Sequence, residues 1–175
     1  MAKFVVSEAF DVPVCVQRSG AKRIDYNALK ELSKQDTPFG EALSRRGVYV
    51  FSIRAGRGEK PWYVGRTVNQ NFLREAFNHR NRLSLQERIN DQKGTLRVTF
   101  VTQKRVYNDQ PNATEIAEIE YLLIGHAAER NSELINIQDK SQRDSFEIEG
   151  VYNDNIRPNR RANHQADFVK MIGLE

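Results

Sequence analysis

Apolar and polar residues alternate along the chain in segments that predict both strands and helices. Residues 47–53 (GVYVFSI) and 61–65 (PWYVG) are rich in β-branched and aromatic residues, and the sequence AGRGEK lies between them. This pattern predicts a β-hairpin with a loop at its tip. Residues 96–102 (LRVTFVT) alternate between apolar and polar positions and predict a third strand.

Helical spacing follows the hairpin and the third strand. Phe72 and Phe77 fall on one face of a predicted helix, and a second short helix is predicted around residues 85–89. Residues 113–130 form the strongest predicted helix, whose apolar face carries Ile116, Ile119, Leu123 and Ala127. The order strand, strand, helix, strand, helix indicates an α+β fold.

The two ends of the chain predict extensions of this central region. Residues 3–6 and 12–17 are expected to be extended, and a helix is expected after Asp25, a suitable N-cap. Cys15 lies in an apolar segment and is predicted to be a small core residue. We therefore expect residues 1–45 to be an N-terminal extension packed on the core, residues 46–137 to form the central domain, and residues 138–175 to form a C-terminal extension with a terminal helix.

Composition is that of an ordinary folded domain. Of the 175 residues, 39% are hydrophobic and 29% are charged, which is enough to bury one core. No apolar run is long enough to span a bilayer, and Glu8 comes too early for a secretory signal, so we expect a soluble cytoplasmic protein with no membrane partner. The net charge of +4 suits a polyanionic partner. No pattern in the sequence specifies an oligomeric state.

Two tripeptides in the predicted hairpin resemble the motifs of a known protein family. Gly47-Val48-Tyr49 and Tyr63-Val64-Gly65 resemble the paired motifs of the GIY-YIG nucleases, and the family's later residues follow in the same order. These are an arginine, a glutamate before apolar helix residues, and an asparagine, at Arg74, Glu120 and Asn136. The resemblance covers residues 47–137. It implies an α+β fold with a three-stranded antiparallel sheet flanked by helices, to which the N- and C-terminal extensions are added.

The resemblance also implies a reaction. It predicts a metal-dependent endonuclease that hydrolyses phosphodiester bonds, with Tyr49 favoured as the base that accepts a proton from water and Tyr63 as a second hydroxyl. A phenol with a usual pKa of about 10 needs nearby cations to ionise, and Arg66 and Arg74 are the candidates.

Glu120 is the expected metal ligand. Mg²⁺ (or Mn²⁺) binds carboxylate oxygen while keeping several waters and substrate phosphate, so one carboxylate suffices; Glu118 is the alternative ligand. The family's histidine would fall at Asn78, and we take the neighbouring His79 as the candidate. His126 and His164 have no partner at zinc-ligand spacing, so zinc is not predicted.

Three functional interpretations follow from these residues. The first is an endonuclease with a nucleic-acid substrate, for which DNA is favoured. The second is a catalytically inactive nucleic-acid-binding module of the same fold. The third is an unrelated α+β protein in which the tripeptides occur by chance. The first two require Tyr49, Tyr63, Arg74 and Glu120 to converge on one surface.

Overall fold

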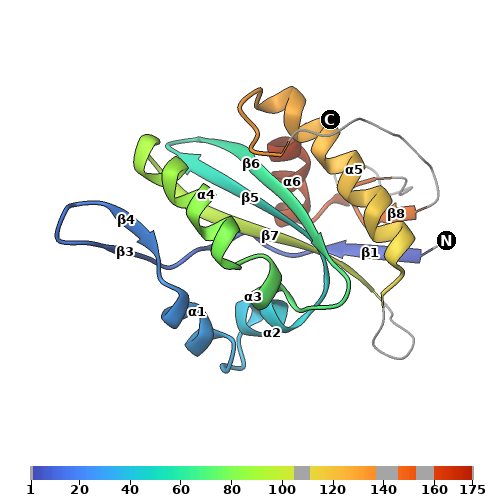
Figure 1. Ribbon diagram of the computed structural model, residues 1–175. Coiled ribbons are helices and arrows are strands. Elements are labelled where there is room, and N and C mark those ends of the chain that lie inside the picture. Colours follow the sequence, from blue (N-terminus) through green and yellow to red (C-terminus); the bar gives the residue numbers. More distant parts are fainter. Residues whose placement is uncertain (1, 105–110, 137–145, 153–159, 175) are drawn as a thin grey trace.

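The structure is a computed structural model that describes residues 2–104, 111–136, 146–152 and 160–174 (Figure 1). The strands are β1 (Ala2–Val6), β2 (Phe10–Asp11), β3 (Val14–Val16), β4 (Lys22–Ile24), β5 (Gly47–Ala55), β6 (Gly58–Thr67), β7 (Thr95–Gln103) and β8 (Phe146–Ile148). The helices are α1 (Tyr26–Leu32), α2 (Pro38–Ser44), α3 (Phe72–Glu75), α4 (His79–Asp91), α5 (Ala113–Arg130) and α6 (Asn163–Ile172).

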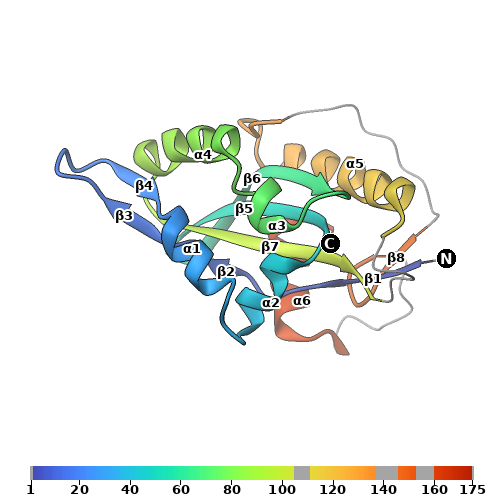
Figure 2. The same cartoon turned by 60° about the horizontal axis from the view of Figure 1, so that its bottom comes forward.

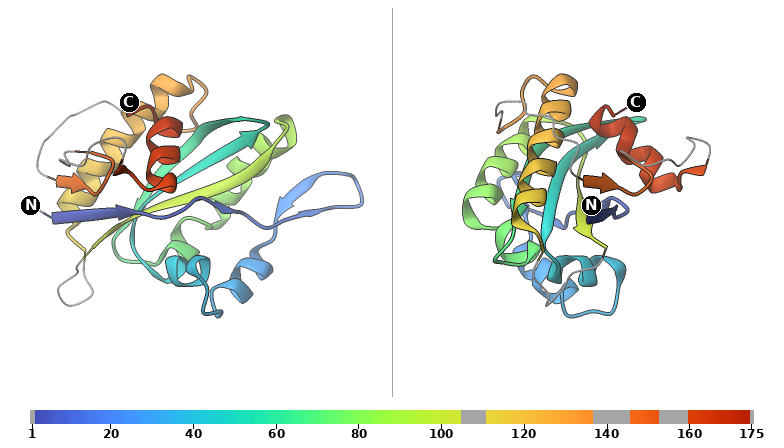
Figure 3. Two further views of the ribbon diagram at one scale, coloured as in Figure 1. Left: turned by 180° about the vertical axis from the view of Figure 1, so that it is seen from behind. Right: turned by 90° about the vertical axis from the view of Figure 1, so that its right-hand side faces the viewer.

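The main sheet is six-stranded, mixed and strongly curled (Figures 1 and 3). Its order is β6-β5-β7-β1-β8, and β2 pairs with β7 beyond the end of β1. Only the β1–β8 pair, among the described strands of this sheet, is parallel.

The expected three-stranded antiparallel sheet is therefore wrong. Strands β6, β5 and β7 are adjacent and antiparallel as predicted, but β1, β2 and β8 extend the sheet beyond β7. These added strands come from the two segments that were predicted to be extensions. Their pairing satisfies backbone groups that β7 would otherwise expose along an open edge.

Each face of the sheet carries its own apolar core. On one face Val48, Val50 and Val64 pack with residues of α5 and α6, and on the other Tyr49, Phe51 and Ile53 pack with residues of α1 to α4. Seen from behind in Figure 3, α6 lies in front of the sheet. Successive residues of a strand point to opposite faces, so β5 is apolar at nearly every position because both of its faces are covered.

Several predicted elements are confirmed. The strands predicted at 47–53, 61–65 and 96–102 lie within β5, β6 and β7, and α5 has the predicted bounds. Helix α4 is longer than the predicted 85–89 because the Asn78 side chain caps its first turn by accepting from the Asn81 N–H. None of the helices in the described part of the chain is long and apolar enough to cross a membrane.

The apolar segment around Cys15 is the second departure from expectation. Cys15 is exposed, so its prediction as a core residue is wrong. Strands β3 and β4 form a separate two-stranded sheet that projects from the body of the protein (Figure 2). We call this hairpin, residues 14–24, the arm.

The two glycines of the tripeptides are required by close packing. A Cβ at Gly65 would lie 2.5 Å from both the Cζ and the hydroxyl oxygen of Tyr49, because the Tyr49 ring crosses over Gly65 in the paired strand. Gly47 has a φ of +145°, and a Cβ there would lie 2.2 Å from the carbonyl oxygen of Val101 in β7. The two tripeptides are thus packed closely within the three adjacent strands β6, β5 and β7.

This packing predicts that Gly65→Ala destabilises the protein. Inserting a methyl group against a buried ring should lower the free energy of unfolding by about 1–3 kcal/mol. Gly58→Ala is the matched control, since it lies in the same strand and its Cβ would meet only the Ala55 carbonyl oxygen at 3.7 Å. Urea denaturation of both variants measures the difference, and equal stability of the two would contradict the assigned Tyr49–Gly65 contact.

Candidate active site

Two tyrosines of the tripeptides lie side by side on one face of the sheet. Tyr49 pairs with Gly65, and Tyr63 pairs with Phe51, so the two tyrosines are diagonal neighbours across β5 and β6. Their ring centroids are 6.0 Å apart and their planes differ by 18°. Tyr49 is only 1% exposed, whereas Tyr63 is half-buried. Tyr63 is therefore the tyrosine that a substrate can reach more easily.

A buried asparagine orients the Tyr49 hydroxyl. The Asn81 side-chain amide donates to the Tyr49 hydroxyl at 3.1 Å and to the backbone carbonyl oxygens of Glu75 and Ala76 at 3.1 and 3.3 Å. Because the amide is a donor here, the Tyr49 oxygen accepts and its own hydrogen is free to be donated onward. Tyr63, whose ring lies beside that of Tyr49, is the next side chain with which the Tyr49 hydroxyl interacts. The result is a chain of neighbouring polar groups from Asn81 through Tyr49 to Tyr63.

The surroundings of the two phenols shift their pKa values to different extents. Burial raises the pKa of Tyr49 far above its ordinary value, and its donation to Tyr63 raises that pKa further. Burial also raises the pKa of Tyr63, but the hydrogen bond from Tyr49 and the positive charge of Arg80 act in the opposite direction. Tyr49 is thus held as a neutral donor, while Tyr63 is the phenol whose ionised form receives support.

Glu120 and Arg66 form an ion pair within electrostatic reach of Tyr63. The Arg66 Nε atom lies 3.4 Å from Oε2 of Glu120, and the Glu120 side chain is 12% exposed. Burial raises the pKa of Glu120, and Arg66 opposes that rise. The Arg66 guanidinium also lies 6.0 Å from the centre of the Tyr121 ring. The negative charge of Glu120 raises the pKa of Tyr63, so both groups belong to one electrostatic cluster.

Asn136 holds the outer edge of β6. Its amide accepts from the Val64 N–H at 3.2 Å and donates to the Val64 carbonyl oxygen, as a neighbouring strand would. Val64 lies between Tyr63 and Gly65, so Asn136 fixes the backbone on which the second tripeptide stands. Its contacts are those of a positioning residue.

The structure does not link Arg74 or His79 to the tyrosines. Both side chains are exposed, Arg74 on α3 and His79 at the start of α4. Within the described ranges, neither side chain has a hydrogen bond or ion pair with the cluster of Tyr49, Tyr63 and Glu120. Arg80 is instead the arginine whose charge acts on Tyr63.

Asn81 and Glu75 were not identified from the sequence. Glu75 lies close enough to raise the pKa of both tyrosines. The signal for Asn81 was present, because Asn81, Leu85 and Ile89 repeat every four residues along the buried face of α4. A polar residue on an otherwise apolar stripe needs a buried partner, and here that partner is Tyr49.

The donor set fits a metal ion that keeps most of its waters. The described residues contain no group of three or more His, Cys, Asp or Glu that could hold a metal ion. A metal at Glu120 would therefore be bound by one carboxylate, with waters and substrate phosphate completing its shell, as Mg²⁺ accepts. The Glu120 carboxylate, desolvated and only partly compensated by Arg66, is suited to a cation.

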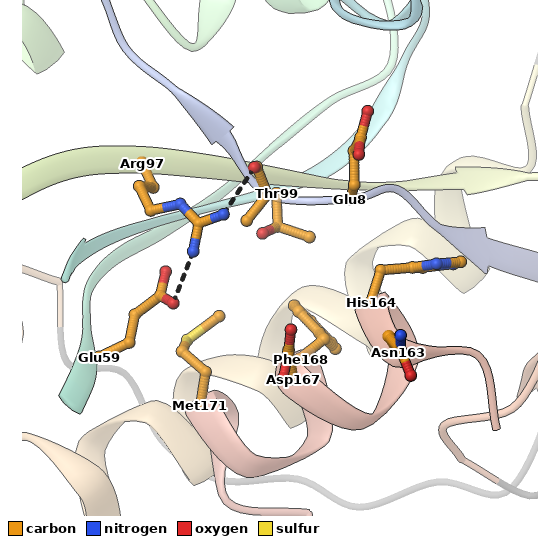
Figure 4. Close-up of a pocket in the computed structure, with 10 residues that line it drawn as sticks. Glu8, Glu59, Arg97, Thr99, Asn163, His164, Asp167, Phe168 and Met171 are labelled. Atoms are coloured by element: carbon orange, nitrogen blue, oxygen red, sulfur yellow. Dashed lines mark hydrogen bonds and ion pairs between the residues drawn. The ribbon is translucent and has the colours of Figure 1, made fainter. Parts of the chain in front are cut away.

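A separate cavity of about 310 Å³ lies between the sheet and α6 (Figure 4). Its main charged group, Arg97, pairs with Glu59 at 2.9 Å and Asp11 at 3.1 Å, and donates to the Ala9 carbonyl oxygen at 2.8 Å. Two of the guanidinium nitrogens, Nη1 and Nη2, donate hydrogen bonds within the protein, whereas Nε forms an ion pair with Asp11 without a hydrogen bond. The charge of Arg97 is thus compensated by two carboxylates of the protein itself.

Comparison with known protein families, with curated proteins and with solved structures finds no match to this chain. The interpretation of the cluster therefore depends on its own geometry and chemistry.

The desolvated carboxylate gives a prediction for pH-dependent stability. Since burial raises the folded-state pKa of Glu120, protonation favours the folded state, and the charged carboxylate lowers stability as pH rises through that pKa. Glu120→Gln should therefore have a higher melting temperature than the wild type at neutral pH. The two melting temperatures should converge as pH falls toward the unfolded value of about 4.3. A less stable variant at neutral pH would show that the Arg66 pair outweighs desolvation.

Proposed function

We propose that this protein is a divalent-metal-dependent endonuclease of the GIY-YIG type that hydrolyses phosphodiester bonds in DNA. The observation that carries the proposal is the chain of polar groups from Asn81 through Tyr49 to Tyr63, together with the Glu120–Arg66 pair whose carboxylate charge acts on Tyr63. A candidate proton acceptor, a cation and a candidate metal-binding carboxylate thus lie within electrostatic reach of one another around the edge of the sheet, whereas Arg74 lies apart from them. These are the groups that phosphodiester hydrolysis requires.

Tyr63 is the proton acceptor in this proposal. The sequence favoured Tyr49, but that phenol is buried and its oxygen accepts from Asn81, which leaves a water little access. Tyr63 receives a hydrogen bond from Tyr49 and faces the charge of Arg80. It would take a proton from the attacking water while Tyr49 stabilises the developing phenolate.

Glu120 would hold the metal, which neutralises charge on the phosphoryl oxygens when bound. A cation there would also offset the negative charge of Glu120 that raises the pKa of Tyr63. Arg66 already lies on Oε2 of the same carboxylate and is exposed enough to turn toward a substrate phosphate.

The Arg66 contact also supports a second candidate function. An arginine that occupies the carboxylate could replace the metal permanently, leaving a nucleic-acid-binding module without cleavage. Metal dependence separates the two candidates. The nuclease needs a divalent ion at Glu120, and the binding module does not.

The proposed division between the tyrosines predicts unequal effects of two matched substitutions. Tyr63→Phe should reduce the cleavage rate by about 10²–10⁴-fold, the usual contribution of a general base. Tyr49→Phe should cause a smaller loss, because it removes only the hydrogen bond that lowers the pKa of Tyr63. Single-turnover cleavage of a labelled duplex measures both rates. A larger loss for Tyr49→Phe would assign the base to Tyr49.

The function itself is tested with Glu120→Gln. The purified protein is incubated with labelled duplex DNA, single-stranded DNA and RNA in Mg²⁺, in Mn²⁺ and in EDTA. We expect wild-type cleavage of duplex DNA only with metal, and no cleavage by Glu120→Gln at any metal concentration. A gel-shift assay should show that the variant still binds.

Glu118→Gln, on the same helix, is the control and also tests the alternative metal ligand. Metal-dependent cleavage by Glu120→Gln, or its loss only in Glu118→Gln, would remove Glu120 as the metal ligand. Binding without cleavage by the wild type in every metal would favour the inactive module.

A further inference from the structure

The arm has the composition of a nucleic-acid-binding element. It carries Arg18, Lys22 and Arg23, and no Asp or Glu occurs between Val12 and Ile24. Within the described part of the chain, none of these three side chains forms an ion pair. Val14 and Val16 are 37% and 69% exposed, which is unusual for consecutive apolar positions of one strand face. The arm thus presents a ribbon of cations and apolar side chains to solvent.

Hydrogen bonds fix the start of β4, next to the turn of the arm, to the end of α4. The Lys22 N–H donates to the Asn90 side-chain oxygen at 2.7 Å, and the Asn90 amide donates back to the Lys22 carbonyl oxygen at 3.0 Å. The Asn90 amide also donates to the carbonyl oxygen of Gln86 within the helix at 2.7 Å. The arm is therefore attached to a helix rather than to a loop.

Helix α4 connects the arm to the candidate active site. Arg80, whose charge acts on Tyr63, lies in the first turn of α4, and Asn90 lies near its end. At 1.5 Å per residue, the two positions are about 15 Å apart along the helix. With about 3.4 Å between successive phosphates of a strand, this equals roughly four to five base pairs of duplex.

We propose that the arm binds duplex DNA, lying in the major groove on one side of the bond to be cut and contacting the flanking phosphates. This proposal rests on the proposed nuclease function and adds the form of its substrate, a duplex that extends past the cut toward the arm. A two-stranded ribbon fits a major groove about 12 Å wide. Arg18, Lys22 and Arg23 would supply phosphate contacts, which position a duplex without reading its sequence.

Cys15 provides a direct probe of the arm, because it is exposed in β3 and is the one cysteine of the chain. The wild-type protein is alkylated with a maleimide in EDTA, so that no cleavage occurs, with and without a duplex of about 30 base pairs, enough to span several turns of about 10 base pairs. We expect the duplex to slow alkylation of Cys15. Unchanged alkylation at a duplex concentration that saturates binding would overturn the proposal.

A charge-matched pair of variants tests the phosphate contacts. The triple substitution Arg18→Ser, Lys22→Ser, Arg23→Ser should reduce the slope of log affinity against log salt by about 3, one for each lost phosphate contact. The control triple substitution Lys3→Ser, Lys34→Ser, Lys104→Ser removes the same charge where a glutamate already pairs with each ammonium. An equal change of slope in both triple variants would show that only the net charge of the protein matters, and it would overturn the proposed contact between the arm and DNA.

Three further outcomes distinguish failure of the arm proposal from failure of the nuclease proposal. Protection of Cys15 by anionic phospholipid vesicles but not by duplex DNA would assign the arm to a membrane surface and overturn the proposal. Protection by duplex in a protein that cleaves nothing in Mg²⁺ or Mn²⁺ would support DNA binding by the arm while the nuclease function fails. Cleavage of the duplex without protection of Cys15 would support the nuclease function and overturn DNA binding by the arm.

Discussion

The Tyr49 ring lying across Gly65 is the contact on which the rest of the candidate site depends. It fixes β5 and β6 in one register, because any residue with a Cβ at position 65 would meet the ring at 2.5 Å. The same register places Tyr63 diagonally opposite Tyr49 and stacks the two rings with their centroids 6.0 Å apart. A slip of one residue would move every side chain of β6 to the other face of the sheet. The same strand register therefore determines both the packing of the core and the positions of the two phenols.

Burial then decides what each phenol can do. Tyr49 is enclosed by Phe51 and Phe72 and is oriented by Asn81, so its hydroxyl serves as a fixed donor. Tyr63 sits nearer the surface and receives that donation. Burial of the charged Glu120 carboxylate lowers the stability of the fold, because the ion pair with Arg66 compensates only part of the lost hydration. Such a cost is typical of groups retained for function rather than for stability.

The local parts of this arrangement could be predicted from the sequence, and the long-range parts could not. Spacing predicted β5, β6 and α5, and the ordered motifs selected Tyr49, Tyr63 and Glu120 as candidate site residues. The pairing of β1 and β8 with the far side of β7 depends on contacts between distant segments, which periodicity does not encode. Cys15 was predicted to be buried because apolar residues favour a core, but it lies on an exposed part of the arm. Arg74 was placed by motif order alone, whereas Arg80, six residues later, is the arginine that acts on Tyr63.

The position of β6 at the edge of the sheet explains how the cluster can assemble at all. Tyr63 and Arg66 are three residues apart in a regular strand, so their side chains start on opposite faces of the sheet. In an interior strand the sheet itself would separate them. At the edge, Glu120 from α5 can pair with Arg66 and still act on Tyr63 around the border of the strand.

An edge strand also carries a risk, since its free backbone groups can pair with another chain. Residues 131–136 reduce that risk, because Asn131, Ile135 and Asn136 bond the outer backbone of β6 at Pro61, Trp62 and Val64. Residues 131–136 thus cover the edge strand β6, and this segment ends at Asn136, which bonds the backbone of Val64 next to Tyr63.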